Sequence, residues 1–402
     1  MDAAPDRSGS AISSHPALPG SQQVKPVTNY LFVSNIRFLS MAAVVLVHCI
    51  SWVFPTTGIS QFGWLERIMR QPAEFDVIGF FLISGFLMEE GLTRWRPAEY
   101  LARRFRMIFV PWLAWFSLYC GMMLANDVAH GRLRLDSMRG IVLAALKEMQ
   151  YGLYSPYWFV PNLLFALCIL LACRRYLFDP RMGCILLMLS LFHGLNLHAH
   201  WVSAGNHNEA LFGFIFYLWL GAWWARNFAA IHAWIARTSM PSLLALAGLA
   251  GLAALLESSV LAATRSPNPM NVLRISNQVY SIAVVLVIFK LRNPVWPRAV
   301  NVRTTTFGIY LTHTIVLWLL IAVAKRTMLG DVAGLTGGAQ EAAAVCLALG
   351  GFAAMYGSSL ALTRWLLVHP RLRWMVGNFA SDSLTGVREE RTTGGSSIFR
   401  ST

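Results

Sequence analysis

Charged residues are scarce in this sequence. Asp, Glu, Lys and Arg make up 13% of the 402 residues, and hydrophobic residues make up 56%. Soluble domains usually carry about 25% charged residues, so the scarcity argues against an ordinary soluble enzyme. The six cysteines show neither metal-ligand spacing nor a disulfide framework. Four histidines and one acid lie near the end of the fifth hydrophobic run and in the loop after it, namely His193, His198, His200, His207 and Glu209. They complete no recognised metal site either, so we predict none.

Hydrophobic runs recur from residue 36 to residue 368. They predict an all-α polytopic membrane protein with about ten transmembrane helices around an intramembrane cavity. The predicted spans are residues 36–54, 75–91, 105–125, 158–173, 183–198, 210–225, 241–262, 276–290, 306–324 and 341–368. No internal repeat is visible, which weakens the case for a transporter built from inverted repeats. The polar ends, 1–30 and 377–402, predict disordered tails on either side of a membrane domain at 31–376.

Lys and Arg concentrate in alternate loops between the predicted spans. Under the positive-inside rule, this pattern places both termini in the cytoplasm. The formal net charge is +14, but the arginines lie between hydrophobic runs and form no basic domain. We therefore expect anionic lipid headgroups, and not nucleic acid, to be the partner of this charge.

One histidine lies deep inside the first hydrophobic run. His48 follows Arg37 by about three helical turns, so both side chains project from one face. The histidine would sit about 16 Å further into the membrane than the arginine, near the middle of the hydrocarbon core. An ionisable ring at that depth is costly and usually functional. His48 could act as a general base towards a hydroxyl, accept an acyl group itself, or simply bond a neighbouring helix.

Arginines also cluster before the third run. Arg103 and Arg106 are three positions apart, so on an α-helix they project from one side. Guanidinium groups bind phosphate oxygens bidentately. The two arginines could therefore bind a phosphate or pyrophosphate group, with Arg37 at the same mouth. The plainer interpretation is contact with lipid phosphates.

Four further polar residues are candidates for lining the same cavity. Tyr310 and His313 share a face of the ninth run, at a depth close to that of the first-run histidine. Ser84 lies in a small-residue stretch of the second run, where helix packing is the default interpretation. Glu257, in the seventh run, is the clearest intramembrane acid, and it could pair with an arginine or orient an acceptor sugar.

Five separated stretches resemble, in order, the membrane-bound acyltransferase-3 family, the integral-membrane O-acyltransferases of bacterial glycans. Arg37 and His48 resemble its Arg-x10-His signature, and residues 103–106 resemble its Arg-x-x-Arg motif. Three more stretches resemble its second, fourth and ninth spans, namely residues 80–86 (FFLISGF), 157–160 (YWFV) and 307–313 (FGIYLTH). Two features depart from the family pattern. Ile78 replaces a frequent acid, and the extra extracytoplasmic hydrolase-like domain of some members has no counterpart.

The resemblance implies that acyl-CoA is the donor, with no resident cofactor, and that the acceptor is a hydroxyl of a cell-envelope glycan or another extracytoplasmic molecule. It implies that Arg37, Arg103 and Arg106 bind the donor and that His48 is the general base. It adds Trp158 to the cavity-lining candidates, and it places the chain in the inner membrane of a bacterium. The acyl chain length (acetyl being the simplest), the acceptor and the oligomeric state stay open.

Two other functions remain open at the level of sequence. A transporter or exporter of a glycan or lipid-linked substrate would move its solute without consuming a thioester. A scaffold for an assembly complex would keep its function after the loss of the buried histidine.

Overall fold

The structure is a computed structural model that describes residues 30–92, 95–132, 137–203, 206–327, 332 and 334–379. Most of the two predicted tails, 1–30 and 377–402, therefore lies outside the described residues. Within the described ranges, the chain forms helices and connecting loops, and no strand is present. The prediction of an all-α protein is confirmed.

Helices occupy the ten places that the hydrophobic runs predict. They are α1 (Leu31–Thr56), α3 (Asp76–Leu92), α5 (Val110–Ala129), α7 (Phe159–Ala172), α8 (Pro180–Ala199), α9 (Ile215–Arg226), α11 (Met240–Ala263), α12 (Ile275–Phe289), α13 (Val302–Thr327) and α15 (Gly338–Val368). Four more α-helices are described with their bounds: α2 (Trp64–Arg70), α4 (Pro97–Arg104), α6 (Met138–Tyr154) and α10 (Phe228–Arg237). Short turns complete the set: 3-10 turns η1 (Gln71–Ala73), η3 (Pro156–Trp158), η4 (Arg174–Tyr176), η5 (His207–Glu209) and η6 (Arg373–Val376), and one π-helical turn, η2 (Phe105–Phe109).

Fewer helices than predicted are long enough to cross a membrane. In the described part of the chain, six helices have the required length and apolar character, or seven if the bent pair formed by α6 and η3–α7 is one span. Of the remaining predicted spans, α9 has only 12 residues and α12 only 15. The structure supports a multi-pass membrane protein, and the count of ten spans is not confirmed.

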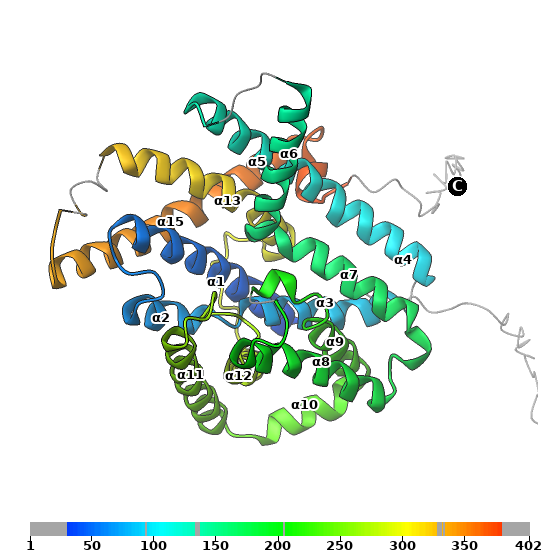
Figure 1. Cartoon of the computed structure of the whole chain (residues 1–402). Helices are drawn as coiled ribbons and strands as arrows, with labels where there is room; N and C mark the ends of the chain where they lie inside the picture. Colours follow the sequence, from blue (N-terminus) through cyan, green and yellow to red (C-terminus); the bar gives the residue numbers. More distant parts are fainter. Residues whose placement is uncertain are drawn as a thin grey trace, which may run out of the picture. The chain divides into compact units, whose positions relative to one another are not determined.

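Helix α1 lies at the centre of the helical bundle. It packs against α3, α12, α13 and α15, and Figure 1 shows the labels of α13 and α15 beside it. In the most apolar windows, 50% of the α1 residues and 56% of the α13 residues are buried, against 17% in α15. Polar side chains on α1 and α13 are therefore shielded by protein, whereas α15 faces outwards.

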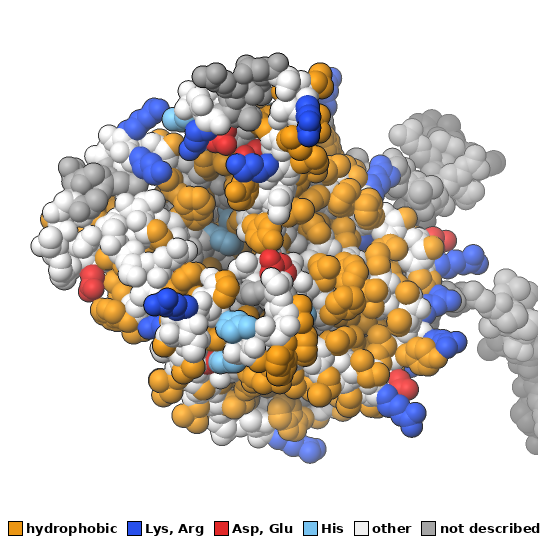
Figure 2. Space-filling model, in the orientation of Figure 1, with side chains coloured by type: hydrophobic (Ala, Val, Ile, Leu, Met, Phe, Trp, Pro, Cys, Tyr) orange, Lys and Arg blue, Asp and Glu red, His pale blue; other side chains and the backbone are white. Residues whose placement is uncertain are grey.

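The outer surface is apolar, as lipid requires. Figure 2 shows hydrophobic side chains over much of the visible face, with most Lys and Arg side chains towards its edges. Large hydrophobic side chains are more than half exposed on α8 and α11, for example Met188 (65%) and Leu249 (68%). Such exposure would be unfavourable in water, and it fits helices that face hydrocarbon.

Two glycines let α3 and α9 pack with almost no space between their backbones. A Cβ atom on Gly85 would lie 1.8 Å from the Leu218 backbone oxygen, and one on Gly221 would lie 2.0 Å from the Leu82 backbone oxygen. Only residues without a Cβ fit on either side of this contact. The stretch that contains Ser84 thus serves helix packing, which was its default interpretation.

A buried ion cluster fixes the chain after α1. Arg70 contacts Glu66 at 3.0 Å and Glu74 at 2.9 Å, and all three residues are buried. Burial alone would lower the pKa of Arg70, but the Glu74 and Glu66 carboxylates outweigh it and raise that pKa. Arg274, just before α12, is fully buried and donates to Gln71 Oε1 (3.1 Å) and to a backbone carbonyl of α11 (2.9 Å). The cluster ties α2 and η1 to α11 and α12.

Candidate active site

Two histidines from different helices meet inside the bundle. The ring centres of His48 on α1 and His313 on α13 lie 5.5 Å apart. His313 is fully buried, whereas His48 is only half-buried. The structure thus brings together two predicted site residues from the first and the ninth predicted spans.

A backbone hydrogen bond orients the ring of His313. Its Nδ1 lies 2.6 Å from the backbone carbonyl oxygen of Tyr310, one helical turn earlier. A carbonyl oxygen only accepts, so Nδ1 must carry the hydrogen. In the neutral ring, Nε2 then bears the lone pair. Nε2 is buried and has no hydrogen-bond partner among the described residues.

The hydroxyl of Tyr310 has a structural partner. It donates to the Pro156 carbonyl (2.9 Å), and the Tyr157 hydroxyl donates in the opposite direction to the Leu311 carbonyl (2.8 Å). These two bonds hold η3 against α13. The proton of the Tyr310 hydroxyl is therefore engaged, and the ring centre lies 5.9 Å from that of His313; whether Tyr310 lines a cavity stays a prediction.

Ser84 lies on α3, which packs against α1, and Trp158 lies in η3, which is hydrogen-bonded to α13. Trp158 is buried in η3, and its ring centre lies 5.3 Å from that of Phe214, which precedes α9. Ser84 is half-buried on α3. Whether either one lines a cavity with His48 stays a prediction.

Three arginines from three elements converge near the start of α1. Arg104, the last residue of α4, and Arg303, in the first turn of α13, lie close enough to Arg37 to repel its charge. Arg37 and Arg104 are half-buried, and Arg303 is exposed. We call Arg37, Arg104 and Arg303 the arginine cluster, and the end of the bundle that holds it the arginine end. It lies about three helical turns along α1 from His48.

Arg103 and Arg106 are not the arginines that repel the charge of Arg37, and whether they bind the donor stays a prediction. Both side chains are exposed and contact different aromatic rings, with Arg103 4.2 Å from the Trp95 ring centre and Arg106 5.1 Å from that of Phe379. The physical reason is the π-helical turn η2, which begins just before Arg106. A π-helical turn holds more residues than an α-helical turn, so the α-helical spacing assumed from the sequence does not apply.

Comparison with known proteins gives one match. A family model described as an acyltransferase domain matches residues 30–371, a range that contains the two histidines and all three members of the arginine cluster. The chain belongs to the acyltransferase-3 family. No curated protein and no solved structure matches it. The chain is thus a membrane acyltransferase, and the sequence resemblance is confirmed.

Glu257 of this acyltransferase has a structural role that the sequence did not reveal. Its two carboxylate oxygens accept from the backbone N–H groups of Ile275 (3.0 Å) and Ser276 (2.7 Å), at the start of α12. His198 Nε2 lies 3.1 Å from the same carboxylate. Glu257 therefore caps α12 and fixes the end of α8. These hydrogen bonds explain why a carboxylate occurs at this position, and the explanation needs no contact between Glu257 and the cavity.

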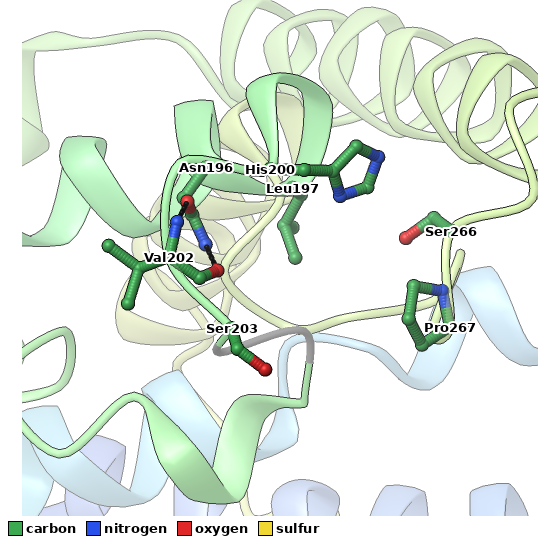
Figure 3. Close-up of a pocket in the computed structure, with 7 residues that line it drawn as sticks. All are labelled: Asn196, Leu197, His200, Val202, Ser203, Ser266 and Pro267. Carbon is green, nitrogen blue, oxygen red and sulfur yellow. Dashed lines mark hydrogen bonds between the residues drawn. The ribbon is translucent and has the colours of Figure 1, made fainter.

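A small pocket opens at the other end of the acyltransferase. It has a volume of about 280 Å³ and lies between the end of α8 and the loop after α11 (Figure 3); its lining residues are Asn196, Leu197, His200, Val202, Ser203, Ser266 and Pro267. Ser266 is only 7% exposed, and its hydroxyl has no partner in the described part of the chain. Arg67 lies on α2, which follows the C-terminal end of α1, and it donates to the Ser258 carbonyl near the C-terminal end of α11. The C-terminal ends of α1 and α11 therefore lie at the same end of the bundle, and the pocket follows α11 there. The arginine cluster lies near the start of α1, so the pocket is at the opposite end.

Proposed function

We propose that this acyltransferase transfers an acyl group, most simply acetyl, from cytoplasmic acyl-CoA to a hydroxyl of an extracytoplasmic acceptor such as a cell-envelope glycan. The observation that supports it best is the arrangement along α1, with a cluster of cations at one end and a partly accessible histidine about three turns further in. In this proposal the arginine end faces the cytoplasm of a bacterium, and both termini lie on that side of the inner membrane.

The donor binds at the arginine cluster. Coenzyme A carries several phosphate groups on one end and its thioester on a long flexible arm at the other. Arg104 and Arg303 repel the charge of Arg37, so the polyanionic end of the donor relieves an existing electrostatic cost when it binds. The arm then extends along α1 and brings the thioester carbonyl to His48.

His48 supplies the proton transfer. A ring nitrogen of His48 takes the proton from the acceptor hydroxyl, and the oxygen attacks the thioester carbonyl carbon. The carbon–sulfur bond breaks, and the departing thiolate takes the proton from His48. The products are the acyl ester and free coenzyme A, and His48 returns to its starting state. An acyl-histidine intermediate would give the same products in two steps.

The acceptor approaches from the opposite end. The pocket near Ser266 contains hydroxyl, amide and imidazole groups, and no Lys, Arg, Asp or Glu is among the described residues that line it. Pockets for drug-sized ligands usually measure about 300–1,000 Å³, so its 280 Å³ suits a small neutral group. In our proposal it holds a hydroxyl-bearing part of the acceptor.

The experiment that tests the function measures thioester consumption and acyl transfer together. Membranes containing the wild type, His48→Ala or His130→Ala at equal levels receive labelled acetyl-CoA and the host glycan fraction. His130 is an exposed histidine at the end of α5 and is the matched control. We expect label in the glycan with the wild type and His130→Ala, and at least about 100-fold less with His48→Ala.

Other outcomes have definite meanings. Equal transfer by His48→Ala and the wild type would remove His48 from the chemistry. If the wild-type protein retains label after exposure to the donor alone and His48→Ala does not, His48 forms an acyl-histidine intermediate and is not a general base. If glycan crosses the membrane without release of free thiol, the protein exports the glycan and the proposed acyl transfer is wrong.

A further inference from the structure

The unpaired ring nitrogen of His313 requires an explanation. Buried polar atoms in folded proteins are nearly always hydrogen-bonded, and each exception points to strain, bound water or function. Among the described buried side-chain atoms without a partner, most are Ser or Thr hydroxyls, one is an indole N–H, and His313 Nε2 is the only basic nitrogen. It lies on one of the two most buried spans, facing the half-buried histidine of α1.

The tautomer of His313 limits what it can do. Because Nδ1–H is bound to the Tyr310 carbonyl at 2.6 Å, Nε2 of the neutral ring can accept a hydrogen bond but cannot donate one. It therefore cannot stabilise an oxyanion, which needs a donor. Its partner must be an N–H or O–H group.

The geometry selects His48 as that partner. The two ring centres are 5.5 Å apart and the ring planes are inclined by 34°. The nitrogens lie on the rims of the rings, so at this separation a rotation of the half-buried ring can bring an N–H of His48 to hydrogen-bond distance, about 3 Å, from Nε2. Full burial keeps His313 itself from meeting a large acceptor, so it acts through His48.

We propose that His313 is the positioning residue for His48. Nε2 of His313 accepts a hydrogen bond from one ring nitrogen of His48. The other ring nitrogen of His48 then carries the lone pair, and this nitrogen faces the acceptor. When His48 takes the hydroxyl proton, both of its nitrogens carry hydrogen, and the bond to Nε2 stabilises the resulting cation. The proton then passes from His48 to the thiolate. His313 gains and loses no proton, and its role matches that of the carboxylate that orients the histidine in other acyl-transfer enzymes.

This inference rests on the proposed function, and two substitutions of His313 test it. In His313→Asn, the amide nitrogen takes the place of Nδ1 and keeps the bond to the Tyr310 carbonyl, but no acceptor remains near Nε2. In His313→Gln, the longer side chain carries an amide oxygen to the place of Nε2. We expect His313→Asn to lower kcat by at least about 100-fold, with the KM for acetyl-CoA unchanged. His313→Gln should recover a large part of that loss.

A structural role would give a different result. If His313 served only to hold its own helix through the Tyr310 carbonyl, His313→Asn would be the milder change and His313→Gln the more severe one. That order, or full activity of His313→Asn, would overturn the inference. Thermal unfolding of both variants in detergent would show that each is folded before its kinetics are compared.

A second measurement separates this inference from the acyltransfer reaction. Nitrogen NMR shifts of ¹⁵N-histidine-labelled full-length protein report which ring nitrogen carries the hydrogen. We expect one fixed tautomer for His48 in the wild type and a mixture in His313→Asn. An unchanged His48 tautomer would overturn the positioning role even if the wild type transfers acyl groups. A fixed tautomer in a wild type that consumes no thioester would instead overturn the proposed function alone.

Discussion

Gly85→Ala would test the contact between α3 and α9 most directly. A Cβ atom at this position would lie 1.8 Å from the Leu218 oxygen, whereas carbon and oxygen in close contact stay about 3.3 Å apart. The two helices would have to separate by about 1.5 Å at this point. Overpacking usually costs about 1–3 kcal/mol. The obstacle here is backbone, which cannot rotate away, so we expect a loss of about 3 kcal/mol in the free energy of unfolding.

The reciprocal contact gives this prediction a sharper form. Gly221→Ala should cost about as much, because its Cβ would lie 2.0 Å from the Leu82 oxygen. Once one substitution has separated the helices, the second meets an open space. The double variant should therefore lose much less than the sum of the two single losses.

Denaturation of the purified protein in mixed detergent micelles, followed by tryptophan fluorescence, would measure these losses. Gly248→Ala on α11 is the control, since nothing lies within 4 Å of its added Cβ and alanine favours helix by about 0.5–1 kcal/mol. Equal stability of Gly85→Ala and Gly248→Ala, or additive losses in the double variant, would refute the close approach of α3 and α9.

Three further predictions concern the site and its surroundings. Arg104→Gln should raise the KM for acetyl-CoA about tenfold, corresponding to a loss of about 1.4 kcal/mol. The side chain of Arg103 stacks on an exposed tryptophan, so Arg103→Gln should change this KM less than about threefold. Equal effects of the two substitutions would mean that Arg103 also binds the donor phosphates. Glu257→Gln should lower the free energy of unfolding by about 1–3 kcal/mol, because two backbone N–H groups lose a charged acceptor, and stability equal to that of the wild type would contradict the cap. Ser266→Ala should raise the KM for the acceptor without reducing stability, since removing an unpaired hydroxyl costs the fold little; an unchanged KM would exclude the pocket from acceptor binding.

The helical period made part of the site predictable from the sequence. It places Arg37 and His48 on one face, and it places Tyr310 one turn before His313. Hydropathy located the helices but overestimated some of their lengths. Residues 210–214 are apolar, yet they form a turn before α9 begins at Ile215. Such a run satisfies a hydropathy criterion whether or not its backbone is helical.

The contacts between distant segments could not be predicted. Arg303 meets Arg37 only because α1 and α13 pack side by side, and no local pattern encodes that pairing. The π-helical turn η2 adds one residue to a turn, which amino-acid propensities do not signal. Glu257 looked like a free intramembrane acid because its partners are backbone N–H groups, which are the same in every sequence.

The repulsion of Arg37 by Arg104 and Arg303 links donor concentration to thermal stability. Three like charges held together by α1, α4 and α13 oppose the packing of these helices, and a polyanion that binds among them favours the folded state by mass action. A ligand at 100 times its dissociation constant adds about 2.7 kcal/mol. Coenzyme A without an acyl group should therefore raise the melting temperature, and salt should have a weaker effect in the same direction. The abundance of the folded enzyme in a cell would then follow the supply of its own donor.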